Sequence, residues 1–219
     1  MDIKKTILTN LRSNTGSYGL STIFFDWVEL MAYAIANASD KTDFSERENA
    51  YLTIVRKYSK EQLSCFSESF AALILALESE KRDWLGEIYM DLGIANRTTG
   101  QCFTPSHVAR LMAELTLSNH DTAFSSDGCI HYFEPCCGSG SLVIGLASAM
   151  EKNGYNYQTE LKVHCEDLDR HCLMMAYIQL SLLGIQAVCQ VKNSLSQDVY
   201  STWLTPFFVL HNCSPFQAQ

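Results

Sequence analysis

The feature that most constrains the fold is a glycine-rich stretch, Glu134-Pro-Cys-Cys-Gly-Ser-Gly140, between two apolar segments. The apolar run 129–133 before it predicts a strand, and residues 141–153 after it predict a helix. Gly138 and Gly140 allow the backbone to turn sharply, and they let a ligand approach peptide groups without an intervening Cβ. A strand, a glycine turn and a helix in this order predict an α/β fold with a ligand site at the turn.

Three more short apolar runs, residues 161–165, 187–191 and 207–211, also predict strands. A helix from Asp169, its N-cap, to Leu183 separates the first two of these runs, and Gly184 ends it. Strands that alternate with helices predict a parallel sheet with right-handed crossovers.

The first hundred residues predict a bundle of helices rather than strands. Apolar stripes at helical spacing place these helices at about 24–38, 46–58, 59–77 and 83–92, and another helix follows at about 104–117. Ser59 and Gln62 form a capping-box pattern, whereas Thr104 and Pro105 predict an N-cap and the first helical residue. We therefore predict an N-terminal helical region over residues 1–99 and an α/β domain over residues 100–219.

Amino-acid composition and net charge limit where the protein can function and what it can bind. Lacking an apolar run of about 18 residues or a signal-peptide pattern, the chain is predicted to be cytoplasmic and not to span a membrane. Its nine cysteines contain no C-x-x-C spacing, so we expect reduced thiols and no metal site. The net charge is −8, with 16 Lys and Arg against 24 acids, so the chain alone is expected to bind DNA only weakly.

Polar residues stand where each of the first three predicted strands ends, and in a parallel sheet these ends share one edge. Asp167 follows the second strand and could accept ribose hydroxyl protons, whereas the nearby Asp169 serves as a helix cap. Asn193 follows the third strand and could bond an adenine edge or simply form a turn. Val143 stands where the dinucleotide fingerprint G-x-G-x-x-G requires Gly or Ala, which disfavours a nicotinamide cofactor.

Three segments in this order resemble the N6-adenine DNA methyltransferases of type I restriction-modification systems. Gly100-Gln-Cys-Phe-Thr-Pro105 resembles the family's "GQFFTP" segment, and the glycine-rich stretch resembles "DPxCGSG". Cys165-Glu-Asp-Leu-Asp169 resembles the strand end "GxExx". The resemblance covers about residues 83–216. It implies a Rossmann-like fold, dependent on S-adenosylmethionine, with a partial parallel sheet behind the N-terminal helical region.

The resemblance also implies roles for eight cofactor-binding residues. Phe103, Thr104 and Pro105 would close over the methionine part of S-adenosylmethionine, and Glu134, Gly138 and Gly140 would contact its amino-acid end. Asp167 would hold the ribose, and Asn193 would face the adenine.

The catalytic motif of the family, Asn-Pro-Pro followed by Phe or Tyr, is altered in this chain. An alignment without a gap places Cys213 at the Asn position and Ser214 at the first Pro, and it retains Pro215 and Phe216. A thiol is a weak acceptor for the adenine amino protons. Asn212 stands one position early, so it would replace the missing amide only if the loop after the predicted fourth strand bulged.

The chain ends at Gln219, whereas the family continues with three more strands, so the predicted fourth strand would form a sheet edge. A homodimer, a partner subunit or the N-terminal helices would then cover this edge. Two hypotheses remain open. The first is an S-adenosylmethionine-binding protein, similar to DNA adenine N6-methyltransferases, with weak or partner-dependent methyl transfer. The second is a catalytically inactive protein of the same fold that acts through protein–protein contacts.

Overall fold

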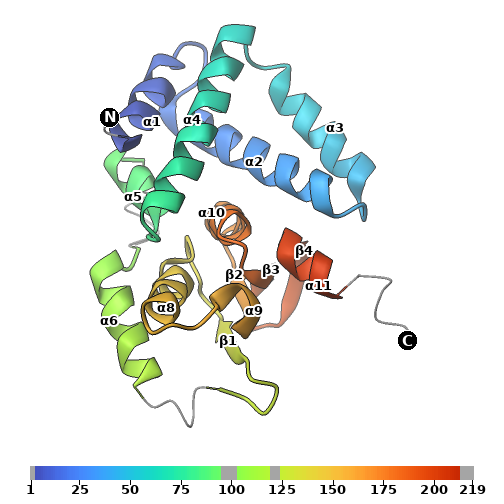
Figure 1. Ribbon diagram of the computed structural model, residues 1–219. Helices are drawn as coiled ribbons and strands as arrows, with labels where there is room; N and C mark the ends of the chain where they lie inside the picture. Colours follow the sequence, from blue (N-terminus) through green and yellow to red (C-terminus); the bar gives the residue numbers. More distant parts are fainter. Residues whose placement is uncertain (1–2, 95–102, 119–123, 213–219) are drawn as a thin grey trace.

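The computed structural model describes residues 3–94, 103–118 and 124–212. Five helices occupy the described residues 3–94: α1 (Ile3–Ser13), α2 (Leu20–Ser39), α3 (Phe44–Val55), α4 (Lys60–Ser79) and α5 (Trp84–Asp91). They form the helical region at the top of Figure 1. The predicted capping box starts α4, because the Gln62 amide donates to Ser59 Oγ at 3.3 Å and the Ser59 amide donates to Gln62 Oε1 at 2.9 Å.

The second half of the chain alternates strands and helices. The elements in order are α6 (Ser106–Leu117), β1 (Ile130–Glu134), α8 (Ser141–Lys152), α9 (Tyr157–Glu160), β2 (Leu161–Asp167), α10 (Arg170–Leu182), β3 (Gln186–Asn193), β4 (Asp198–Leu204) and α11 (Pro206–Asn212). The sheet order is β1-β2-β3-β4, in which the first three strands are parallel and β4 is antiparallel to β3. This arrangement confirms the predicted α/β fold with a partial parallel sheet.

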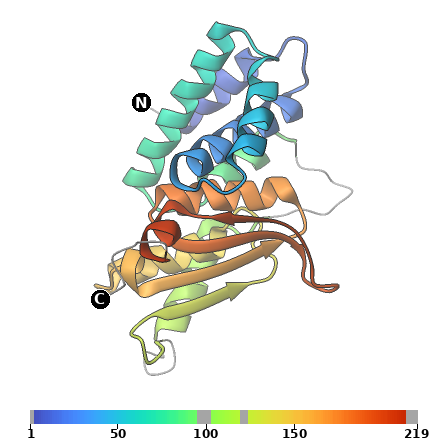
Figure 2. The same ribbon diagram turned by 90° about the vertical axis from the view of Figure 1, so that its right-hand side faces the viewer.

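Helix α10 is the element that joins the two halves, lying between the helical region and the sheet (Figure 2). Its lower side packs on β2 and β3, and its upper side packs on α2. At its first turn the Arg170 guanidinium donates to Tyr33 OH at 2.9 Å, and His171 stacks on Phe25 with ring centroids 3.9 Å apart. Because α10 is apolar all round, its residues from Cys172 to Leu180 are buried, as expected for a helix enclosed on both sides.

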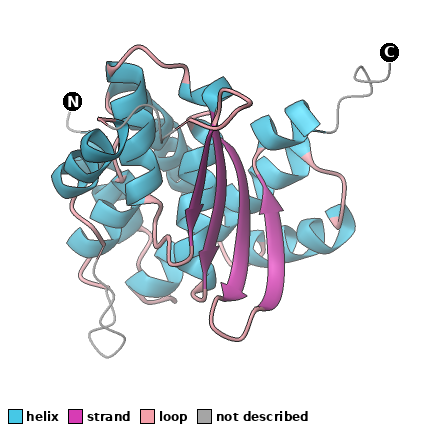
Figure 3. Ribbon diagram, turned by 90° about the horizontal axis from the view of Figure 1, so that it is seen from below, coloured by secondary structure: helices cyan, strands magenta, loops and turns pink. Residues whose placement is uncertain are grey.

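The opposite face of the sheet is seen from below in Figure 3. Phe133 is 57% exposed and packs edge-on against His164, whose Nε2 lies 3.1 Å from Gln190 Oε1. Gln190 Nε2 in turn donates to Thr202 Oγ1 at 3.2 Å. The described helices therefore cover one face of the sheet and leave this face open.

The prediction of a fourth strand at residues 207–211 is wrong. These residues form helix α11, which begins at Pro206, a residue whose fixed φ suits the first helical position. The fourth strand is instead Asp198–Leu204, a segment rich in β-branched and aromatic residues that folds back on β3 through the turn 194–197. Helix α6 also begins one residue later than predicted, with Pro105 rather than Thr104 in the cap position.

Among the described helices, none is both long enough and apolar enough to cross a lipid bilayer.

Candidate functional site

The glycine loop lies at the carboxyl end of β1, and its two glycines have backbone conformations that favour glycine. Gly138 has φ of 54° and Gly140 has φ of 90°. A Cβ on Gly140 would lie 3.3 Å from the backbone of Ala176 in α10, so the loop also needs a glycine for close packing. The Cys137 amide donates to the carbonyl oxygen of Glu166 at 2.9 Å, which ties the loop to the end of β2.

Asp167 joins the end of β2 to the glycine loop. Its Oδ2 accepts a hydrogen bond from the Gly138 amide at 2.8 Å, and its Oδ1 accepts one from the Asp169 amide at 2.8 Å. Burial raises the pKa of the Asp167 carboxyl, although these backbone hydrogen bonds oppose the shift. Asp169 caps α10, accepting from the His171 amide at 2.8 Å. The Leu168 amide also bonds to this carboxyl, which leaves a lone pair that could accept a ligand hydroxyl.

The segment 103–105 covers the glycine loop from the other side. A Cβ on Gly138 would lie 3.1 Å from the Phe103 ring, so that ring rests directly on the loop. Phe103 also packs edge-on against Tyr89 of α5, with centroids 5.5 Å apart. Ser141, the first residue of α8, donates from Oγ to the Thr104 carbonyl oxygen at 2.7 Å. The predicted residues Phe103, Thr104, Gly138 and Asp167 are therefore brought together, as is Gly140.

Glu134 and Asn193 lie at the same edge of the sheet but use their oxygens locally. Glu134 Oε2 accepts from Tyr132 OH at 3.1 Å, at the start of the glycine loop. Asn193 Oδ1 accepts from the amides of Leu195 at 3.0 Å and Ser196 at 3.2 Å, the turn role foreseen as the alternative. The next residue, Ser194, donates to the Pro135 carbonyl oxygen at 2.9 Å, so the β3 end adjoins the loop.

Four of the five predicted catalytic residues, Cys213, Ser214, Pro215 and Phe216, lie outside the described residues. Asn212 is the last residue of α11, exposed, and its Nδ2 donates to the Phe208 carbonyl oxygen of its own helix at 2.8 Å. Asn212 was expected to replace the motif amide only if a loop after a fourth strand bulged, and in the structure it ends helix α11 rather than following a strand.

A buried polar network that the sequence did not predict lies beneath the glycine loop. Asp83 caps α5, accepting from the Gly86 amide at 2.8 Å, and its other oxygen accepts a hydrogen bond from Ser139 Oγ in the loop. Gln179 of α10 donates to Asp83 Oδ1 and to the Ser139 carbonyl oxygen, both at 2.9 Å. Burial raises the pKa of Asp83 despite these hydrogen bonds. The cap pattern Asp83-Trp-Leu-Gly86 was the available signal.

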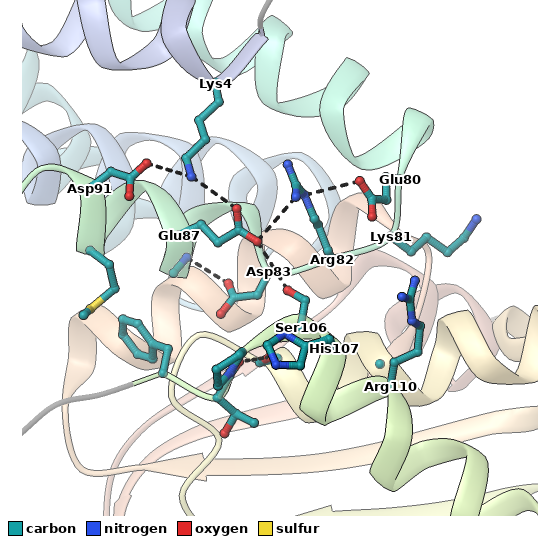
Figure 4. Close-up of a pocket in the computed structure, with 17 residues that line it drawn as sticks. Lys4, Glu80, Lys81, Arg82, Asp83, Glu87, Asp91, Ser106, His107 and Arg110 are labelled. Carbon is teal, nitrogen blue, oxygen red and sulfur yellow. Dashed lines mark hydrogen bonds and ion pairs between the residues drawn. The ribbon is translucent and has the colours of Figure 1, made fainter.

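A pocket of about 440 Å³ lies beyond the segment 103–105, away from the glycine loop (Figure 4). The segment itself, Ser141 and charged residues of α1, α5 and α6 line it, whereas the predicted residues Glu134, Gly138, Gly140, Asp167 and Asn193 do not. Phe103, Thr104 and Pro105 thus line this pocket, and the Phe103 ring also rests on Gly138 of the glycine loop.

The profile of the N-6 DNA methylase family matches residues 80–219, which include α5, the segment 103–105 and the glycine loop. None of the curated proteins compared with the chain matches it.

Among solved structures, the chain is similar to the type I restriction-modification system methyltransferase subunit from Streptococcus thermophilus. The identity is 15% and the TM-score is 0.40, and the alignment covers 84% of this chain and 56% of the subunit. The present chain therefore spans little more than half the length of that subunit. The family assignment comes from the profile, which matches well over half of the chain: the protein belongs to the N-6 DNA methylase family.

Proposed function

We propose that the chain binds S-adenosylmethionine at the glycine loop and takes part, weakly or with a partner subunit, in methylation of adenine N6 in DNA. One observation carries the proposal. The Gly138 amide, the Asp167 carboxylate and the Phe103 ring meet at the carboxyl ends of β1 and β2, where parallel sheets bind ligands.

The residues present fit such a cofactor, with one restriction. Gly138 offers a surface without a Cβ, and Phe103 would have to shift to admit a ligand, since it now rests on that surface. Asp167 keeps a lone pair for a ribose hydroxyl. Asn193 uses its Oδ1 in the turn, so its amide would serve adenine as a donor to a ring nitrogen. Glu134, Thr104 and Pro105 would bound the methionine end.

The bound cofactor would supply an electrophilic methyl group, and the protein's task would be to hold the adenine amino group against it. That task needs a preorganised acceptor for the amino protons and an aromatic ring to stack on the flipped base. Phe216 supplies the ring, whereas Cys213 is a poor acceptor. The proposal therefore includes slow transfer by the chain alone.

The second candidate is a protein of this fold that has lost catalysis and acts through protein contacts. Cys213 in place of the motif asparagine favours it, and so does Asn212, whose amide bonds its own helix. The open sheet face with Phe133 would suit a protein partner better than DNA, and so would the outer side of β1, which pairs with no strand in the described part of the chain.

Calorimetry with S-adenosylmethionine tests the first step, and a labelled-methyl transfer assay on mixed-sequence DNA tests the second. We expect the parent chain to bind the cofactor. Its rate of methyl transfer should be about 10²–10³-fold lower than with asparagine at position 213, because Cys213 is a poor acceptor for the amino protons. Cys213→Asn combined with Ser214→Pro should raise the rate, and Phe216→Ala in that background should abolish the gain. Failure to bind cofactor at millimolar concentration would refute the proposal.

If the double variant binds cofactor and remains inert, the second candidate is favoured. Rapid N6-methyladenine formation by the unmodified chain that survives replacement of Asn212 would mean that another residue activates the amine.

A further inference from the structure

The outer face of α6 carries four large apolar side chains that are substantially open to solvent. They stand at spacing i, i+3, i+4 and i+7 and are between 37% and 63% exposed: Val108, Leu111, Met112 and Leu115. This spacing places all four on one side of the helix, and we call them the α6 stripe. Helix α6 lies at the outer edge of the lower half of Figure 1, with α8 on its inner side.

The inner side of α6, which packs on α8, is built mainly from small residues. Ala109 and Ala113 are buried there, and Leu117 is the large apolar residue that joins them near the end of the helix. A Cβ on Gly145 of α8 would lie 2.9 Å from the backbone of Ala109, so the two helices approach each other closely. Since each residue turns an α-helix by about 100°, the α6 stripe lies on the opposite side. A helix that turns its larger apolar residues away from its own core presents a surface for a second packing partner.

We propose that the α6 stripe binds the same stripe of a second copy of this chain, with the two helices antiparallel about a two-fold axis. The spacing of the four residues is the same in both chain directions, so a two-fold axis between Leu111 and Met112 superimposes the stripe on itself. Val108 of one copy then packs against Leu115 of the other, and the two central residues pack against their own equivalents. A two-fold interface requires such a self-complementary patch. The stripe shares no residue with the proposed cofactor site, so the inference does not depend on the proposed function.

The charges around the α6 stripe favour a second copy over a strongly charged partner. Glu114 is the only acid in α6, and it is held by α8, where Lys152 Nζ donates to it at 2.8 Å and Asn153 Nδ2 at 3.2 Å. The exposed residues of this part of the chain that border the stripe are His107, Thr116 and Ser118. Although each copy has net charge −8, the contact therefore brings no acidic side chains of α6 together. The repulsion between two copies acts over a longer range, where salt screens it.

The size of the α6 stripe predicts a weak and reversible dimer. The largest apolar patch on a typical monomer measures about 300–600 Å², whereas a standard interface buries about 800 Å² on each partner. Four side chains that are each about one third to two thirds exposed fall nearer the first of these values. We therefore expect dissociation in the micromolar range, with the dimer and the monomer both observable in solution.

Sedimentation equilibrium of the full chain over a range of concentrations tests the proposal, with no cofactor present. Leu111→Glu and Leu115→Glu are the principal variants, because side chains that are 61% and 63% exposed can be changed without opening the core. Leu75→Glu makes the same substitution at a residue of α4 that is 57% exposed, so it is the matched control. Circular dichroism and thermal melting show whether each variant is folded.

We expect the average mass of the parent to rise with concentration from 24.6 kDa toward twice that value. The dissociation constant should be about tenfold larger or more in Leu111→Glu and Leu115→Glu, because each buries an unpaired charge, and unchanged in Leu75→Glu. Added salt should strengthen the dimer, because it screens the repulsion between two copies of net charge −8. A parent chain that stays monomeric far above the micromolar range would overturn the proposal, as would a dimer that Leu75→Glu weakens as much as Leu115→Glu does.

A mixture of two variants tests the two-fold geometry itself. The axis brings position 111 of one copy beside position 111 of the other, so Leu111→Glu and Leu111→Lys should each be monomeric alone. An equimolar mixture should dimerise, because the two introduced charges attract each other across the axis. If the parent dimerises but the mixture remains monomeric, the two copies do not meet through this face in the proposed way.

Discussion

The glycine loop after β1 and the turn after β3 stand at the same edge of the sheet, yet they are held in different ways. Ser139 in the loop is fully buried and bonded to Asp83 and Gln179, which are 56 and 40 positions away in sequence. Ser194 at the start of the turn after β3 is half-buried and bonds to Pro135 and Glu166. Residues 195–197 are exposed, with Leu195 at 97%, and the amides of Leu195 and Ser196 bond to Asn193. The methionine side of the proposed site is therefore fixed by the core, whereas the adenine side is a surface hairpin.

The largest effect that separates the two regions is expected at Asp83. Asp83→Ala leaves the Gly86 amide, Ser139 Oγ and Gln179 Nε2 without their acceptor inside the core. Each unsatisfied buried group costs about 1–3 kcal/mol. Gln179 Nε2 keeps the Ser139 carbonyl oxygen as an acceptor and the desolvated carboxylate is removed, so we expect the free energy of unfolding to fall by about 2–4 kcal/mol in all. Urea denaturation measures it. Asp198→Ala, which removes an exposed carboxylate bonded to Ser196, should change stability little. Equal losses in both variants would show that the loop is no better anchored than the hairpin.

The pH dependence of the free energy of unfolding of Asp83→Asn tests how the core holds the glycine loop. Burial raises the pKa of Asp83 above its usual 3.8, so between that value and the raised pKa the folded protein holds a proton that the unfolded chain has released. The stability of the parent should therefore fall as the pH rises through this window. Asp83→Asn lacks the titration, so its stability relative to the parent should improve with rising pH. The pKa of Asp167 is also raised, so its titration lowers stability with rising pH equally in the parent and in Asp83→Asn. It therefore does not affect the difference between the two proteins.

A smaller effect is expected at Asp167, and it concerns ligand binding. Asp167→Ala removes the acceptor of the Gly138 amide and of the proposed ribose hydroxyls, so cofactor affinity should fall by about 1–3 kcal/mol. Asp167→Asn keeps one carbonyl oxygen and should lose less. Calorimetry with S-adenosylmethionine measures both. Unchanged affinity in the alanine variant would place the cofactor elsewhere.

How much the sequence could predict differs between the same two regions. The turn at Gly138 and Gly140, the Asp169 cap and the ends of α8 and α10 follow from local rules, and the structure confirms them. Asp83 as partner of Ser139 could not be predicted, because the contact joins segments 56 positions apart and depends on how α5 packs against the loop.

The error after β3 has a local cause. The apolar run 207–211 was interpreted as a strand, although Pro206 immediately before it favours a helix start. The segment Asp198–Leu204 has the β-branched and aromatic residues typical of a strand. It was not predicted as one because it begins with a charged residue and contains polar residues. Short apolar runs do not distinguish strands from helices by pattern alone. The residues that flank such a run distinguish the two, and here Pro206 indicates a helix.

The smallest effect is expected at Asn193, where two substitutions separate a turn role from a ligand role. Asn193→Ala removes the acceptor for the Leu195 and Ser196 amides, which remain accessible to water, so stability should fall by only about 0.5–1 kcal/mol. Asn193→Asp retains an acceptor oxygen for the turn and removes the Nδ2 donor. If that donor faces the adenine ring, the aspartate variant should be as stable as the parent and bind S-adenosylmethionine several-fold more weakly. Full affinity in Asn193→Asp, together with reduced stability in Asn193→Ala, would mean that the residue only shapes the hairpin. In that case the exposed end of the site would recognise the cofactor through some other group, and only the side anchored by Asp83 would have been identified correctly.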